Sequence, residues 1–296
     1  MAWSSTYSIV ACDLERRDWG VAVQSRFLAV GALAAWAEAE VGAVATQSFL
    51  NTAYGEQGLD LMRQGASARE ALDRVLAHDD EPEKRQVGVV DGRGETACHT
   101  GEACHEWAGH RTGPGYAVQG NMLVSSATLD ALAETLAATD GPLARRLLTA
   151  LAAGQAAGGD RRGQQSAALL VARKGGGYGG TDVAVDLRVD DHPSPVAELQ
   201  RLFGLHNLYF GSTPTEHLLP LEGPLRAEVR ACLERLGYAT GDLASDLEAW
   251  AGIENLEERV EGAEWIDPVV LGELRRTAAP EPDQATTANR EEGHDG

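Results

Sequence analysis

Polar side chains lie inside or at the ends of otherwise apolar runs in this 296-residue chain. They are amides, hydroxyls and a few charged groups, at Thr6, Gln24, Ser25, Thr46, Gln47, Ser48, Gln119, Asn121, Asp160, Arg161, Arg162, Gln164, Gln165 and Ser166. Buried amides and hydroxyls cost free energy unless they are hydrogen-bonded, so a group of them at strand ends indicates a shared polar site. The alternative interpretation is that each one satisfies backbone groups of its own loop.

Other patterns that carry chemistry are absent or weak. The sequence contains no GxSxG elbow, HExxH motif, Walker loop or GxGxxG after a strand. The glycine run at 175–180 lies between two apolar segments without a following Lys-Ser/Thr, which favours a flexible hairpin. The pairs Cys98-His99 and Cys104-His105 supply four metal-ligand side chains, but their spacing matches no common zinc knuckle. We therefore predict a hairpin there, with no metal and no cofactor.

The elements that must position the polar groups follow from the apolar runs. Strand-length runs occur at 6–12, 20–25, 30–36, 41–49, 86–91, 95–100, 116–124, 166–173 and 182–191, and helical spacing at about 59–76, 126–138, 141–156 and 195–210. The strands are small and apolar on both faces, as is typical of strands covered on both sides. Runs of strands that alternate with helix pairs predict an α+β fold of two stacked sheets with helices outside.

The chain divides into three parts. Residues 1–212 form the predicted α+β domain. From about residue 217 to 276, helical spacing predicts a small all-α domain with three helices. Residues 277–296 are rich in Pro, Thr, Asp and Glu and lack apolar periodicity, so we predict a disordered tail.

Charge and composition limit the partners. The formal net charge of -20 and the pI of about 4.7 oppose binding to nucleic acid and to anionic membrane surfaces. No apolar run approaches the ~18 residues of a membrane span, and the first residues do not read as a signal peptide. With four cysteines and no export signal, we expect a cytoplasmic protein with reduced thiols.

Six segments, in order, resemble a known prokaryotic family: STYSIVACD, WGVAVQSRFLAVG, WAEAEVGAVATQS, the HTG at 99–101, VQGNML and AGGDRRGQQSAALLV. Over about residues 5–212 the chain resembles the domain of unknown function 1028 family, which is assigned to the N-terminal-nucleophile (Ntn) hydrolase superfamily. The resemblance implies a four-layer αββα sandwich, which agrees with the layered interpretation above. The helical part from about 217 to 276 resembles a peptidoglycan-binding domain that accompanies some members.

The superfamily resemblance implies a specific chemistry. A Thr, Ser or Cys at the mature N-terminus attacks an amide carbonyl, and its own α-amine acts as the base. The family's first strand often begins Met-Thr, and the matching position is Thr6. Five residues precede Thr6 here, so activity requires cleavage after Ser5, for example by attack of the Thr6 hydroxyl on the preceding carbonyl. Cleavage after Ser4 would instead expose Ser5, one position before the family's threonine.

The remaining roles are assigned from residue type. Gln47 and Asn121 are candidate oxyanion donors, and Ser25 is a candidate to tune the amine or relay protons. Candidate substrate-binding residues are Gln24, Gln119, Asp160, Arg162 and Gln165.

The leading hypothesis is an Ntn-type amidohydrolase acting on a small amide or peptide-like bond. Peptidoglycan or its fragments are the further expected partner, and we expect a homo-oligomer. The alternative is a non-catalytic binding protein that joins an Ntn fold to a cell-wall or glycan-binding module. In a third interpretation the C-terminal domain is purely structural or forms the oligomer. Glycan contact would depend on Tyr238, Trp250 and Trp265, unless these side chains fill the small domain's own core.

Overall fold

The computed structural model describes residues 6–279, which form two compact units with a boundary between Gly204 and Leu205. The boundary lies inside helix α6 (Pro195–Phe210), earlier than the 212–217 region expected from helical spacing. Val196 and Leu199 of its first half are buried in the first unit's core, whereas the second half belongs to the second unit. One continuous helix thus contributes to two hydrophobic cores, which helical periodicity alone does not reveal.

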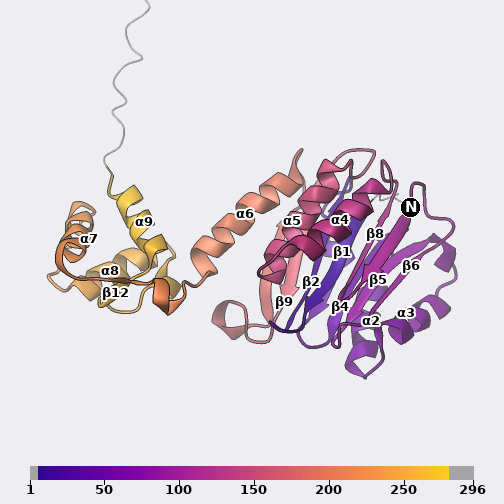
Figure 1. Ribbon diagram of the computed structural model, residues 1–296, viewed down its shortest axis with the longest axis horizontal. Helices are drawn as coiled ribbons and strands as arrows, with labels where there is room; N and C mark the ends of the chain where they lie inside the picture. Colours follow the sequence, from indigo (N-terminus) through magenta and orange to yellow (C-terminus); the bar gives the residue numbers. More distant parts are fainter. Residues whose placement is uncertain (1–5, 280–296) are drawn as a thin grey trace, which may run out of the picture. The chain divides into compact units, whose positions relative to one another are not determined.

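The first unit contains a six-stranded sheet in which neighbouring strands are antiparallel (Figure 1). Its order is β10-β9-β2-β1-β8-β7, with β1 Thr6–Asp13, β2 Asp18–Ser25, β7 Gly109–Gly113, β8 Tyr116–Asn121, β9 Ser166–Ala172 and β10 Val183–Val189. Helices α4 (Ala127–Ala138) and α5 (Leu143–Ala156) cover one face of this sheet. Leu147 and Leu151 are fully buried there against Ile9, and each such side chain contributes about 1.5–3 kcal/mol by burial.

A four-stranded antiparallel sheet forms the other half of this unit. Its order is β3-β4-β5-β6, with β3 Ala35–Glu38, β4 Gly42–Ser48, β5 Arg85–Asp91 and β6 Thr96–Thr100. Helices α2 (Ala53–Arg63) and α3 (Ala68–Ala77) pack on it, and α3 begins at a capping box made by Ser67 and Glu70. Gly55 lets α2 approach the Trp36 ring, because a Cβ at that position would lie 2.2 Å from the indole.

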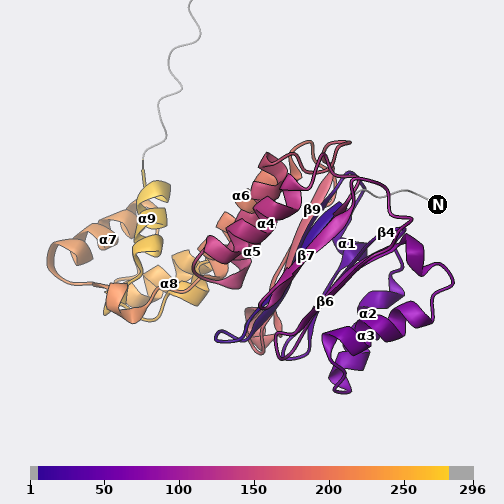
Figure 2. The same cartoon turned by 45° about the vertical axis from the view of Figure 1, so that its right-hand side comes forward.

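The uncovered faces of the two sheets meet, so the helix pairs lie on the outside of the paired sheets (Figure 2). Small or β-branched side chains from both sheets, such as Val10, Val21, Ala43 and Val90, are fully buried between them. The predicted mixture of helices and strands, with a helical C-terminal region, is confirmed.

Two local predictions were wrong. The segment 30–36 is not one strand, because Gly31–Ala34 forms the short helix α1 before β3 begins at Ala35. Strand β7 was missed, since Gly109–Gly113 is a half-exposed edge strand without apolar alternation. The strand conformation of β7 depends on its backbone pairing with β8, and its side chains lack the apolar alternation from which a strand is predicted.

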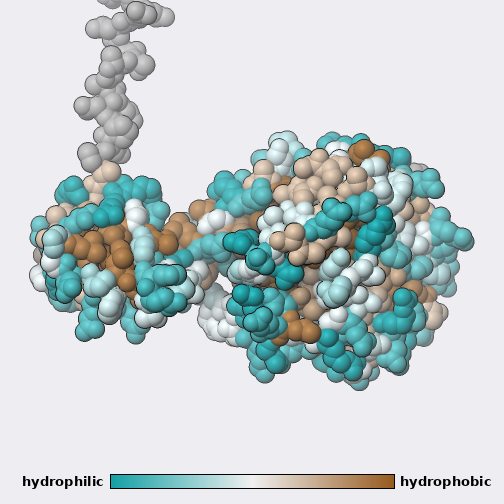
Figure 3. Space-filling view, in the orientation of Figure 1, coloured by the Kyte–Doolittle hydropathy of each residue, from teal (hydrophilic) through white to brown (hydrophobic). Residues whose placement is uncertain are grey.

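The second unit is mainly helical, with α7 Gly223–Arg235, α8 Leu243–Ile253 and α9 Pro268–Thr277 around a small core. A two-residue ladder joins β11 (Leu219–Pro220) to β12 (Trp265–Ile266). Figure 3 shows apolar surface on this unit, bordered by hydrophilic side chains. Within the described residues, none of the helices has the length and apolar character to cross a membrane. Most of the predicted tail, from residue 280 onward, lies outside the described residues.

Candidate functional site

Thr6 is the first described residue of β1, at the centre of the six-stranded sheet. Its Cα is paired with Ser25 on β2 and with Asn121 on β8, so the three side chains lie at one level on the same face. That face is the one between the two sheets. Side chains alternate along a strand, so Thr6 and Val10 of β1 point to the same side, and Val10 belongs to the core between the sheets. The Thr6 hydroxyl donates to Ser25 Oγ at 3.1 Å, and all three side chains are buried.

Gln47 approaches Thr6 from the opposite sheet. Its Nε2 donates to the Thr6 carbonyl oxygen at 3.2 Å and to Gln86 Oε1 at 2.8 Å. Its Oε1 accepts a hydrogen bond of 2.6 Å from Ser8 Oγ. Both amide protons of Gln47 are therefore used, and this side chain holds the Thr6 main chain rather than offering a donor to an oxyanion.

Gln86 is the centre of the buried network. Its Oε1 accepts from Gln47 and, at 2.9 Å, from Asn121 Nδ2. Its Nε2 faces three acceptors: the Gly120 carbonyl at 2.9 Å, Thr100 Oγ1 at 3.0 Å and the Gly109 carbonyl at 3.1 Å. Gln86 thereby connects both sheets at the level of Thr6.

Gln86 and Ser8 were not among the residues predicted for the site. Gln86 is the second residue of β5, where the sequence suggests only a polar residue of the loop before the strand. The feature that could have identified Gln86 is its position directly opposite Gln47, but this pairing can be recognised only when the order of the strands in the sheet is known.

Gln119 also points into the layer between the two sheets, but its amide is hydrogen-bonded to other side chains there. Its Nε2 donates to Ser8 Oγ at 2.7 Å, and its Oε1 accepts from the Cys98 thiol at 3.4 Å. Gly88 on the opposite sheet makes room for this amide, because a Cβ there would lie 2.3 Å from Gln119 Oε1. Gln119 therefore connects the two sheets structurally.

Three non-glycine residues with left-handed backbone surround this end of the sheets. Ser48 (φ 71°) ends β4, Met122 (φ 50°) follows Asn121, and Ala29 (φ 52°) comes shortly after β2. Such conformations cost about 1–3 kcal/mol each and collect at functional sites. Arg17, Glu40 and Asn255 adopt the same conformation in turns elsewhere in the chain, so this backbone feature does not by itself mark a site.

Asp160 organises the loop that crosses the same end. Its Oδ2 accepts from the Arg26 backbone N–H at 2.9 Å, next to Ser25, and its Oδ1 accepts from the Arg162 N–H at 2.8 Å. The Arg162 guanidinium also pairs with this carboxylate at 3.1 Å, and its side chain is 27% exposed whereas that of Asp160 is fully buried. Asp160 is thus a loop-holding residue, and Arg162 is the member of this pair that reaches solvent.

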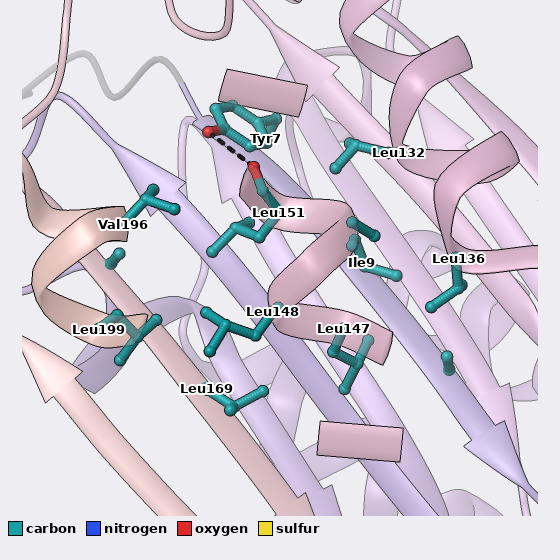
Figure 4. Close-up of a cluster of buried hydrophobic side chains, with 14 of the residues drawn as sticks. Tyr7, Ile9, Leu132, Leu136, Leu147, Leu148, Leu151, Leu169, Val196 and Leu199 are labelled. Atoms are coloured by element: carbon teal, nitrogen blue, oxygen red, sulfur yellow. Dashed lines mark hydrogen bonds between the residues drawn. The ribbon is translucent and has the colours of Figure 1, made fainter. Parts of the chain in front are cut away.

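Two predicted substrate-binding residues point elsewhere. Gln165 donates through its backbone N–H to the Ser25 carbonyl at 3.0 Å, but its side chain bonds to Asp191. Gln24 neighbours Ser25 in a strand and therefore faces the opposite side, the helix-covered layer that also contains Tyr7. Figure 4 shows this layer, where the Tyr7 hydroxyl donates to the Leu151 carbonyl at 3.4 Å.

The network around Thr6 is electrically neutral. The side chains bonded to Thr6 are those of Ser25 and Gln47, and the network continues through further amides and hydroxyls to the Cys98 thiol, beyond Gln119, and to the His110 ring, beyond Thr100. Burial raises the pKa of Cys98 far above its usual range, so that thiol stays protonated. The side chains bonded directly to Thr6 therefore offer no proton acceptor that works near neutral pH, and the His110 ring, whose pKa is lowered by burial, joins the network at Thr100 Oγ1, 2.9 Å from its Nδ1.

The cysteine–histidine pairs do not form a metal site in the structure. Alternation along β6 separates the neighbours: the Cys98 thiol bonds to Gln119, whereas His99 Nε2 lies 2.9 Å from the Pro82 carbonyl oxygen. Between residues 6 and 279, no group of three or more His, Cys, Asp or Glu side chains is arranged to hold a metal ion. A groove of about 390 Å³ lies between α2 and α3, outside the four-stranded sheet and away from Thr6.

Comparisons with known proteins agree with these two units. A family of unknown function, DUF1028, matches residues 6–199, and a domain described as "Putative peptidoglycan binding domain" matches residues 210–274. The chain therefore belongs to the DUF1028 family, as its motifs predicted, and it carries a peptidoglycan-binding-like domain. The family match begins at Thr6.

A solved structure supports the same assignment. The crystal structure of protein SPO2555 from Silicibacter pomeroyi, which is labelled with the same family, is similar with a TM-score of 0.64 and 30% sequence identity. The similarity covers 71% of this chain and 92% of that one. No curated protein matches the chain significantly.

Proposed function

We propose that the first unit is an N-terminal-nucleophile amidohydrolase whose nucleophile is Thr6, released by cleavage of the Ser5–Thr6 bond. The observation that carries the proposal is the setting of Thr6. Its hydroxyl is held by Ser25 at 3.1 Å and its carbonyl by Gln47 at 3.2 Å, at a point where the bonded side chains offer no base. The paired sheets with outer helices are the arrangement expected of this superfamily.

The missing base is what an N-terminal amine supplies. In the intact chain the Thr6 nitrogen is an amide and accepts no proton. After cleavage it would become an α-amine with a pKa of about 7.7–8.0, which is partly neutral at physiological pH. That amine takes the hydroxyl proton as Thr6 Oγ1 attacks the substrate carbonyl and later returns it to the leaving amine.

Asn121 is the better oxyanion candidate of the two amides. It lies directly opposite Thr6 on β8 and donates to Gln86 Oε1 at 2.9 Å, whereas Gln47 donates to the Thr6 carbonyl oxygen itself. A developing oxyanion is stabilised most by donors that are already fixed in place, and the Gln86 contact fixes this side chain.

The release of Thr6 uses the same hydroxyl. Thr6 Oγ1 attacks the Ser5 carbonyl carbon, the bond from that carbon to the Thr6 nitrogen breaks, and the nitrogen keeps its own hydrogen and takes up the hydroxyl proton, which makes it a free amine. Water then hydrolyses the resulting ester, which gives the Ser5 carboxylate and restores the Thr6 hydroxyl. The reaction needs no co-reactant other than water.

The second unit points to peptidoglycan as the partner, since its family model is described as peptidoglycan-binding. We therefore infer that the substrate is a small amide or peptide-like compound related to peptidoglycan. The intact polymer lies outside the cytoplasm, so a cytoplasmic protein would meet only its fragments.

Intact-mass measurement tests the proposal directly. The purified protein should lose residues 1–5, Thr6→Ala should abolish this loss, and Thr6→Ser should retain it because a hydroxyl nucleophile remains. The processed protein should then hydrolyse amide bonds in soluble peptidoglycan fragments. A chain that stays full length, with Thr6→Ala indistinguishable from it, would reject the enzyme and favour the non-catalytic binding protein.

A further inference from the structure

The aromatic side chains of the second unit separate into buried and exposed ones. Trp250 is 1% exposed and is part of the helical core, and Tyr238 packs partly buried against the same core. Trp265, in contrast, is 50% exposed. Each of the two alternatives therefore applies to part of the set: Trp250 and Tyr238 pack in or against the core, and Trp265 is the one of the three available to a ligand.

The short ladder between β11 and β12 decides which way Trp265 faces. Leu219 is paired with Ile266, and Pro220 is paired with Trp265. Ile266 is 3% exposed and Leu219 packs on the core, so alternation places Pro220 and Trp265 together on the outer face. Directly opposed residues have Cβ atoms about 4.5–5.5 Å apart, so the indole and the proline ring form one apolar platform.

Hydrogen bonds fix this platform on both sides. The Leu221 N–H donates to the Glu264 carbonyl at 2.8 Å, directly beside the Pro220–Trp265 pair. On the other side Asp267, the N-cap of α9, accepts from the Arg259 guanidinium at 2.6 Å. A rigid platform loses little conformational entropy when a ligand binds.

Polar groups border the platform. Glu222 and Glu264 are exposed next to its two strands, and exposed Arg226 donates to the Ala263 carbonyl at 3.1 Å. A pyranose ring needs this combination, since its C–H face is apolar and its edge carries hydroxyls and, in amino sugars, acetamido groups. A platform of two side chains is much smaller than the ~800 Å² per partner of a protein interface, so one sugar ring fits it better than a protein surface.

We propose that the Trp265–Pro220 platform is the sugar-stacking site through which this protein binds the glycan strands of peptidoglycan. The inference rests on the proposed peptidoglycan partner and is independent of the chemistry at Thr6. It assigns one site to the second unit and leaves Trp250 a structural role.

Co-sedimentation of the full-length chain with insoluble peptidoglycan tests the platform. Trp265→Ala should weaken binding at least tenfold, and Trp265→Phe should retain most of it because an aromatic face remains. Ile253→Ala is the matched control, since Ile253 is a 71% exposed apolar residue of the same unit outside the platform, and it should bind like the unsubstituted chain. Circular dichroism should show that each variant stays folded.

The outcomes separate the two proposals. Equal binding by Trp265→Ala and the unsubstituted chain would overturn the platform while leaving peptidoglycan as the partner. An unsubstituted chain that stays in the supernatant would overturn both the partner and the platform, whereas Thr6 processing, measured separately, would be unaffected. Equal retention on cellulose would show that the platform does not select peptidoglycan and would also overturn the proposal.

Discussion

Replacing Gln86 with methionine removes the centre of the buried network without a large change in side-chain length. The substitution deletes three buried hydrogen bonds, to Gln47, Asn121 and the Gly120 carbonyl. It also deletes two partly buried ones, to Thr100 and the Gly109 carbonyl. Gln47, Asn121 and the Gly120 carbonyl stay buried, so they recover little from water.

The expected loss follows from the bond count. The Gln86 amide has two protons for its three acceptors, so about four hydrogen bonds are lost together, and at about 1 kcal/mol net for each they correspond to about 3–5 kcal/mol. In a domain of this size 1 kcal/mol shifts the melting temperature by about 2–4 °C, so Gln86→Met should melt about 10 °C lower. Differential scanning calorimetry of the full chain measures this shift.

Gln24→Met is the matched control. Gln24 is as deeply buried as Gln86, but neither of its amide atoms has a hydrogen-bond partner in the described part of the chain. The same substitution at Gln24 removes a buried unpaired amide and should leave the melting temperature unchanged or raise it. If the two variants lose the same stability, size and shape rather than hydrogen bonding govern these positions, and the network argument is refuted.

Two further predictions concern titratable groups. The Arg85 guanidinium holds the pKa of Asp79 well below its ordinary value. The stability from ionised Asp79 is therefore present above about pH 4 and is lost as the pH falls further, so thermal melts across this range should show a smaller acid loss for Asp79→Asn than for the unsubstituted chain. Burial raises the pKa of Cys12 to about 11 and also raises those of Cys98 and Cys104, so iodoacetamide should label these thiols slowly until the protein is unfolded. Rapid labelling of Cys98 in the folded protein, counted by mass spectrometry, would contradict its burial.

Part of the candidate site could be predicted because polar residues interrupt apolar runs. Thr6, Ser25, Gln47 and Asn121 stand out in this way, and the structure brings all four to one level between the sheets. Gln24 stands out equally, yet it faces the helices. Neighbouring residues of a strand point to opposite faces of the sheet, so only one of Gln24 and Ser25 can lie on the same face as Thr6.

The choice between the two faces depends on packing. Both faces of β1 and β2 are apolar, so the pattern along the chain does not say which face meets the second sheet and which meets α4 and α5. The hydrogen bonds from Gln86, Thr6 and Gln119 join residues that are 14 to 111 positions apart, and their pairing follows from sheet order. Gln86 acquires its central place only through that order.

The sequence by itself determined the family, the mixed helices and strands of the first unit, the helical character of the second, and Thr6 as the residue at which the first strand begins. These features depend on local apolar periodicity and on short motifs, which are properties of neighbouring residues. Only the tertiary structure decided that Gln86 links both sheets, that Gln24 faces away from Thr6, and that Trp250 is buried while Trp265 is exposed. Those outcomes depend on which surfaces pack together, and packing is set by contacts between residues that are distant in the chain.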